Sequence, residues 1–200
     1  AFQGVAKVDP PSNSTDWSTH PVDCFVLAKL EEHDLQPVGD ASRATLIRRA
    51  YSDLLGLPPT PQAIEKFVEA PAPDAYPRLI DRLLASPRYG ERWGRYWLDL
   101  ARYADTAGDN GDFPIPEIYR YRDYVIDSFN ADKPFDQFIK EQVAGDLLSG
   151  TTTDERHIAT GFLAMGPKSL NNRNAREFKM DLVDEQLDVT TRAFMAVTVA

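Results

Sequence analysis

The chain has 200 residues, of which 42% are hydrophobic and 26% are charged, a composition that suits one folded domain or two small ones. Its formal net charge is -9 at pH 7, from 22 Lys and Arg against 31 Asp and Glu. This acidic balance argues against nucleic acid as a main partner, because phosphate binding requires a basic face, and it disfavours an anionic membrane surface. No apolar run is long enough to predict a membrane span.

Cys24 is the single cysteine of the chain. One cysteine excludes an intramolecular disulfide and a Cys-x-x-Cys-His haem-attachment motif, so we expect no cofactor bound covalently within this chain. Because three apolar residues follow it, Cys24 is predicted to be a small buried hydrophobe. No signal peptide begins at Ala1, which indicates either a cytoplasmic protein or a piece of a mature exported one.

Residues 1–19 are predicted to form an extended arm, since Pro10 and Pro11 lie beside a short polar stretch that favours loops. We expect residues 20–200 to form a single helical domain, with Thr19 and Ser42 among the residues that cap its helices. In chain order, helices are expected over about 20–33, 42–55, 60–70, 79–84, 86–105, 117–129, 134–143, 154–165 and 177–197. The predicted fold class is all-α: an irregular bundle of about eight or nine helices around an aromatic-rich core.

The stretch from Ser86 to Asp105 carries two of the three tryptophans and is predicted to be one helix with two opposed faces. Its apolar stripe contains Trp93, Trp97, Leu100 and Ala104, and its charged stripe contains Arg88, Glu91, Arg95, Asp99 and Arg102. We therefore expect Trp93 and Trp97 to lie inside the fold. The last predicted helix reaches residues 196–200 without a Gly or Pro stop signal, which predicts that the natural polypeptide continues.

Eight sequence blocks spread over most of the chain match one known family. They are residues 20–30, 43–61, 89–105, 121–126, 129–136, 142–148, 159–163 and 184–194, and the third reads Tyr89-Gly-Glu-Arg-Trp-Gly-Arg-Tyr-Trp-Leu-Asp-Leu-Ala-Arg-Tyr-Ala-Asp105. With these blocks the chain resembles the helical planctomycete-type domain of unknown function that is found beside cytochrome C domains in large exported proteins.

In that family the block ending near Phe194 continues into a Cys-x-x-Cys-His motif. The resemblance therefore implies haem c on the segment following Ala200, with this cytochrome c segment and a downstream domain of the same polypeptide as partners. It also implies a periplasmic or otherwise exported location. Family members often occur near sulfatases and polysaccharide-degrading enzymes, so glycans are further possible partners. The expected function is a helical module that supports periplasmic redox chemistry linked to polysaccharide breakdown.

Four arginines form the candidate anion-binding surface: Arg95, Arg102, Arg120 and Arg122. The helical spacing of Arg95, Asp99 and Arg102 is typical of a solvated, salt-bridged helix face. Alternatively, they line a cleft in which guanidinium groups hold carboxylates or sulfates in pairs of hydrogen bonds. Haem propionates or an acidic glycan are suitable anions for that second interpretation.

The loop from Asp105 to Glu117 is rich in oxygen ligands and glycine, and it is a weak candidate for a calcium site. Its candidate ligands are Asp105, Asp109, Asp112 and Glu117. The spacing does not fit an EF-hand, so an ordinary cluster of turn residues is the alternative.

Whether the chain is an enzyme stays open from the sequence. A polysaccharide hydrolase or lyase would need a carboxylate- and tyrosine-lined cleft, for which Asp99, Tyr103 and Asp105 are weak catalytic candidates. With 31 acidic residues, helix surfaces or buried ion-pair networks are the more usual explanation of these carboxylates, and no catalytic pair can be assigned. A non-catalytic carbohydrate-binding or structural module is a further alternative.

Overall fold

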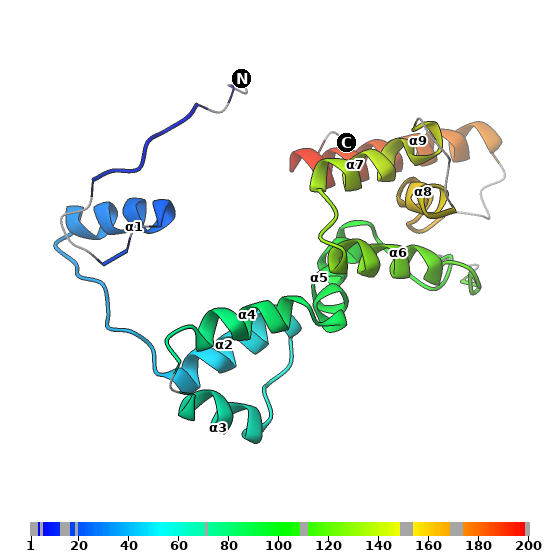
Figure 1. Ribbon diagram of the computed structural model, residues 1–200. Helices are drawn as coiled ribbons and strands as arrows, with labels where there is room; N and C mark the ends of the chain where they lie inside the picture. The colour runs from blue at the N-terminus through cyan, green and yellow to red at the C-terminus, as the bar shows by residue number, and fades with distance from the viewer. Residues whose placement is uncertain are drawn as a thin grey trace. The chain divides into compact units, whose positions relative to one another are not determined.

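The computed structural model describes residues 4, 6–12, 17–18, 20–70, 72–108, 112–148, 154–168 and 174–198. Within these residues the chain forms nine α-helices and two short 3₁₀ helices, and its only β-type pairing is an isolated bridge between Thr106 and Pro114 (Figure 1). The helices are α1 Pro21–Glu32, α2 Arg43–Leu55, α3 Pro61–Glu69, α4 Ala75–Leu84, α5 Pro87–Leu100, α6 Tyr119–Asn130, α7 Phe135–Ala144, α8 Asp154–Ala159 and α9 Ala175–Met195. The prediction of an all-α fold is confirmed.

Contacts between backbone atoms divide the chain into two compact units, Ala1–Ser42 and Arg43–Ala200. The first unit therefore contains the predicted arm and α1, and the second contains α2 to α9. The single domain predicted over residues 20–200 stays a prediction.

Helix α1 begins as the sequence indicates, but it buries a different face. The Nδ1 atom of His20 accepts a hydrogen bond from the backbone N–H of Val22 at 3.3 Å, and Pro21 occupies the first turn. Thr19, the predicted cap, lies outside the described residues. Cys24 and Leu27 are buried, which confirms the interpretation of Cys24. The helical spacing of Val22, Phe25, Val26 and Leu30 predicts that their side faces inward, but Val22, Phe25 and Val26 are exposed.

The second unit has two hydrophobic cores. The first lies among α2, α3 and α4 and contains Ile47, Ala50, Phe67, Leu79 and Leu83. The second lies among α5 to α9, and its buried residues include Trp97, Tyr121, Tyr124, Phe138, Phe162 and Val189.

Trp97 lies at the centre of the second core and is 5% exposed. The centroid of its ring system is 4.8 Å from that of Phe138, 5.7 Å from that of Phe162 and 5.8 Å from that of Phe194. These rings come from α5, α7, the 3₁₀ helix after α8, and α9, so one indole joins four segments of the chain. The predicted aromatic-rich core is confirmed.

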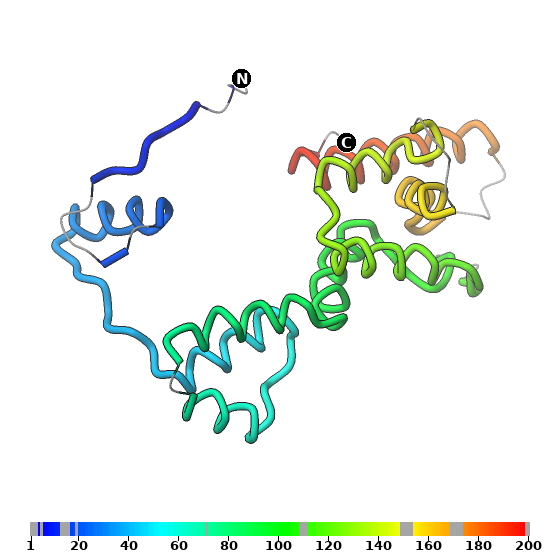
Figure 2. The backbone as a smooth tube through the Cα atoms, in the orientation of Figure 1, coloured from blue at the N-terminus to red at the C-terminus, as the bar shows by residue number. Residues whose placement is uncertain are grey.

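Helix α5 buries its small residues, and this corrects the predicted apolar stripe. Gly90, Gly94, Trp97 and Ala101 are buried, whereas Trp93 is 36% exposed and Leu100 is also exposed. The backbone turns back after α5 so that α6 packs against α5 (Figure 2). Gly90 and Gly94 lie on the side of α5 that faces α6. A Cβ atom on Gly90 would stand 2.4 Å from the carbonyl oxygen of Ile126, so only glycine permits this approach of the two helices.

Helix α5 ends at Leu100, five residues before the predicted end. Arg102 has a φ of 58°, the left-handed conformation that closes a helix. The N–H of Arg102 donates to the carbonyl of Asp99 at 3.2 Å, and the N–H of Tyr103 donates to that of Leu98 at 3.0 Å. Arg102 therefore leaves the helical charged stripe to which the sequence pattern assigned it.

Two further helices differ from expectation in detail. In α7, the apolar spacing predicts that Phe135, Phe138, Ile139 and Val143 face inward. Phe138 is buried, but Phe135 and Val143 are exposed, and the polar residues Glu141 and Gln142 are buried. Helix α9 ends at Met195, where Ala196 adopts a left-handed φ of 53° and supplies the C-cap that the sequence pattern did not predict.

Candidate functional site

The predicted residues Tyr103, Asp105 and Arg122 come together where α5 ends and α6 begins. The hydroxyl of Tyr103 donates a hydrogen bond to Oδ1 of Asp105 at 2.7 Å. Burial and, to a lesser extent, this hydrogen bond to a carboxylate raise the pKa of Tyr103 to about 12, whereas the nearby positive charge of Arg122 acts to lower it. Arg122 itself donates through Nε and Nη2 to Oδ1 of Asp123 at 3.0 and 2.8 Å.

Arg102 belongs to a second, partly buried cluster. Its Nη2 atom donates to the carbonyl of Met165 at 3.0 Å, and its Nη1 atom lies 3.6 Å from Oε2 of Glu185 on α9. The ammonium of Lys168 lies 3.9 Å from the same carboxylate oxygen. Burial lowers the pKa of Lys168 although Glu185 opposes the change. This cluster ties the end of α5 to α9.

Each of the four arginines predicted to bind anions has a carboxylate within ion-pair distance. The pairs are Arg95 with Asp99 at 4.0 Å, Arg102 with Glu185 at 3.6 Å, Arg120 with Glu117 at 2.6 Å and Arg122 with Asp123 at 2.8 Å. The pair on α5 is well exposed, which fits a solvated face. The anion-binding surface stays a prediction.

The acidic loop after α5 uses several of its predicted calcium ligands for other contacts. Oδ1 of Asp112 accepts from the N–H of Gly108 at 3.0 Å. Asp105 accepts from Tyr103, and Glu117 pairs with Arg120. Asp109 lies outside the described residues, and among the described ones no group of three His, Cys, Asp or Glu is placed to hold a metal ion. Calcium binding stays a prediction.

A chain of polar groups runs through the aromatic core, and the sequence pattern did not indicate it. The indole N–H of Trp97 donates to the hydroxyl of Tyr121 at 2.9 Å, and this hydroxyl donates to Oε1 of Gln142 at 2.5 Å. Burial raises the pKa of Tyr121, so the hydroxyl keeps its proton. These two hydrogen bonds fix Trp97 in one orientation between α6 and α7.

Glu141 is a buried carboxylate surrounded by donors. Its Oε2 atom accepts from Nζ of Lys133 at 2.6 Å and from the hydroxyl of Tyr124 at 2.8 Å, and its Oε1 atom accepts from Gln137 at 2.9 Å. Burial raises the pKa of Glu141, but the bonds from Lys133, Gln137 and Tyr124 together outweigh it, so the pKa is lowered. The hydrophobic period of α7 cannot reveal such a residue, because only its partners make its burial acceptable.

A cleft of about 310 Å³ lies between α6 and α8. Its lining includes three carboxylates, those of Asp123, Asp127 and Glu155, together with Tyr124 and Lys133. Asp123 also pairs with Arg122, so the cleft adjoins the cluster at Tyr103. The lining also includes Arg120, so the cleft carries charges of both signs. Carboxylates that face each other from two helices are among the groups that glycan-cleaving clefts use.

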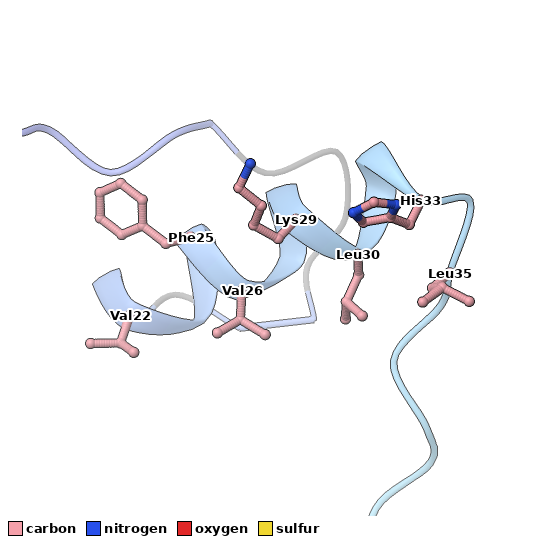
Figure 3. A pocket seen from close by; sticks show the side chains of 7 residues that line it. All are labelled: Val22, Phe25, Val26, Lys29, Leu30, His33 and Leu35. Carbon is pink, nitrogen blue, oxygen red and sulfur yellow. The ribbon is translucent and has the colours of Figure 1, made fainter.

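Two helices expose rows of apolar side chains. On α1, Val22, Val26 and Leu30 follow one side of the helix and line a groove of about 520 Å³ (Figure 3). On α9, four large apolar residues are 45% to 60% exposed: Met180, Val183, Leu187 and Met195. Their spacing places them along one side of α9, opposite the buried Val189. We call these four residues the α9 row.

The described residues have an all-α fold, with two hydrophobic cores in the second unit and exposed apolar rows on α1 and α9. None of the described helices is both long and apolar enough to cross a membrane. The chain belongs to the PSCyt2 family, a protein family of unknown function (DUF1549), whose model matches residues 21–200. Searches of curated proteins and of solved structures found no match.

Proposed function

We propose that this chain is a docking module which holds a c-type cytochrome segment of the same exported polypeptide and supports redox chemistry in the periplasm. The α9 row carries the proposal. Exposed apolar residues aligned on one helix are typical of a surface that a partner covers. The resemblance of the sequence blocks supplies the identity of the partner, and the downstream domain of the polypeptide is a second one.

The haem in this proposal lies outside the 200 residues. Covalent attachment requires two cysteines and a histidine in one motif, whereas this chain has one cysteine, which is buried in α1. The residues present therefore do not fit a covalent haem site of their own. What the chain contributes is the rigid surface of α9, which the aromatic core holds through Phe194 and Trp97.

The first test is expression of the complete gene that encodes this chain in a host that matures c-type haem. We expect the purified product to show the absorbance of covalently bound haem. A product without this absorbance would rule out the cytochrome as partner while leaving the docking surface itself open to test.

The second test is the substitution Leu187→Asp in that product. A charge in the centre of the α9 row would have to lose its water when the partner docks, which weakens docking. We therefore expect trypsin to digest the cytochrome segment about tenfold faster in this variant. The control is Lys179→Gln, which lowers the charge of α9 equally at an exposed residue outside the row. Equal cleavage of both variants and the parent would contradict docking on α9.

A second candidate function is favoured by the acidic cleft between α6 and α8. We propose glycan binding or cleavage there as the alternative, with Asp127 and Glu155 as the acting carboxylates. Against a panel of neutral, uronate-containing and sulfated polysaccharides, we expect release of reducing ends that Asp127→Asn lowers at least about 100-fold. Asp136→Asn, an exposed carboxylate on α7 outside the cleft, should leave the rate unchanged. No release, with no binding to any member of the panel, would exclude this function.

A further inference from the structure

A groove lies between α3 and α4, outside all the surfaces that the proposed function uses. Both helices pack against α2, and they make fewer contacts with each other than with α2 (Figure 1). The opening between them has a volume of about 480 Å³. A cavity of this size is in the range that holds small organic ligands.

The floor and the rim of this groove differ in character. The floor is apolar and includes Phe67 and Leu79, which are buried residues of the first core, and Tyr51 of α2 adds a partly exposed ring. The rim carries Lys66 from α3 and Arg82 from α4. An apolar floor under a charged rim suits a molecule that has both an apolar body and a charged end.

The charge of the rim is positive in a chain that is otherwise acidic. Residues 43–86 contain six Arg and Lys against five Asp and Glu, whereas the whole chain has a net charge of -9. Arg78, the third cation of the rim, pairs with Asp74 at 2.6 Å. Within the described part of the chain, Lys66 and Arg82 form no ion pair, so both are available to a ligand.

The positions of the cations favour an anion lying across the groove. Arg78 and Arg82 are one turn apart on the same side of α4, and Lys66 comes from the opposite wall. A carboxylate between the walls would accept hydrogen bonds from the guanidinium of Arg82 and from the ammonium of Lys66. Its hydrocarbon part would then cover Phe67 and Leu79.

From this geometry we infer that the α3–α4 groove binds an amphiphilic carboxylate, a molecule with one carboxylate at the end of an acyl chain or an aromatic ring system. The apolar floor provides affinity through burial of the hydrocarbon part. The cations provide selectivity for the charged end over a neutral one. This inference is independent of docking on α9 and of the acidic cleft.

The test is calorimetric titration of the 200-residue chain with dodecanoate and with 2-naphthoate. We expect at least one of them to bind with a Kd below about 1 mM. Dodecanol and 2-naphthalenemethanol, which lack the charge, should bind at least about tenfold more weakly than the matching carboxylate. The preferred carboxylate then distinguishes an acyl chain from an aromatic body.

The variant Lys66→Gln with Arg82→Gln should weaken carboxylate binding about tenfold. The matched control is Arg48→Gln with Arg88→Gln, which changes the net charge equally at two exposed residues outside the groove and should leave Kd within about twofold. Circular dichroism verifies that both variants keep their helices. Absence of carboxylate binding, equal binding of the alcohols, or equal weakening by both double variants would overturn the inference.

Discussion

Replacing Gly90 by alanine is expected to lower the free energy of unfolding by about 3 kcal/mol. The new Cβ atom would stand 2.4 Å from the carbonyl oxygen of Ile126 and 2.7 Å from Cγ of Asn130. Asn130 cannot simply move away, because its Oδ1 accepts from the N–H of Gly90 at 2.8 Å and its Nδ2 donates to the carbonyl of Pro87 at 3.2 Å. Helices α5 and α6 would therefore have to separate, and this disturbs the core at Trp97.

Gly94→Ala is the matched control for this substitution. Its Cβ atom would lie 3.4 Å from Cγ1 of Val125, which is an ordinary contact, and alanine favours a helix over glycine by up to about 1 kcal/mol. We expect its stability in urea unfolding to equal or exceed that of the parent. If Gly90→Ala and Gly94→Ala had the same effect on the unfolding midpoint, the close approach of α5 and α6 would be wrong.

The substitution Lys133→Met is expected to cost about 3 kcal/mol at neutral pH, because it leaves the carboxylate of Glu141 buried without its cation. The control is Lys140→Met, which removes the cation of an exposed ion pair with Asp136 within α7. It should change the free energy of unfolding by at most about 0.5 kcal/mol. Urea unfolding of the two variants measures the difference directly. Similar losses in both would contradict the burial of Glu141.

The same pair predicts the sign of a pH dependence. The pKa of Glu141 is lower in the folded chain than in the unfolded one, so its contribution to stability is complete above the unfolded pKa and is lost as the pH falls through the folded pKa. In Lys133→Met, Lys133 no longer opposes the rise that burial causes in the pKa of Glu141. Protonation of Glu141 then removes the unpaired buried charge and stabilises the folded variant. The stability difference between parent and variant should therefore shrink as the pH falls, and a difference that grows would contradict this assignment.

Much of the secondary structure follows from local chemistry that the sequence displays. Thr60 and Ser86 each precede a proline, accept a backbone hydrogen bond and start α3 and α5 where predicted. Apolar spacing likewise predicted that Trp97 lies inside the fold, where it is a buried residue of the second core. These predictions succeed because caps and periodicity act within one helix.

The orientation of helices was harder to predict because it depends on partners. The helical spacing of the apolar residues predicted that Trp93 faces inward, but the glycine side of α5 permits the closer contact with α6. Trp93 lies instead against Tyr96, with 5.6 Å between ring centroids. Glu141 and Gln142 are polar, so no hydrophobic pattern marks them as buried. Their donors and acceptors come from α6 and from Lys133 before α7, and only the folded chain brings these groups together.

The candidate site, too, was predictable only where its residues are close together in the sequence. The sequence selected Tyr103, Asp105 and Arg122, and the turn at Arg102 brings them into one cluster. It did not indicate the cleft between α6 and α8, whose carboxylates stand on two helices that are distant in sequence. Nor did it show that the α9 row faces outward, because an apolar stripe on a helix has the same pattern whether it faces a core or a partner.

The most direct test of docking on α9 uses the three methionines of the chain as probes of solvent access. Met180 and Met195 belong to the α9 row and are 52% and 60% exposed, whereas Met165 is buried in the second core at 5%. Peroxide oxidation, followed by peptide mass spectrometry, compares the 200-residue chain with the complete gene product. We predict that oxidation of Met180 and Met195 is at least about tenfold slower in the complete product, while Met165 is slow in both. Equal oxidation rates for Met180 and Met195 in the two proteins would contradict the proposal that a neighbouring segment covers α9.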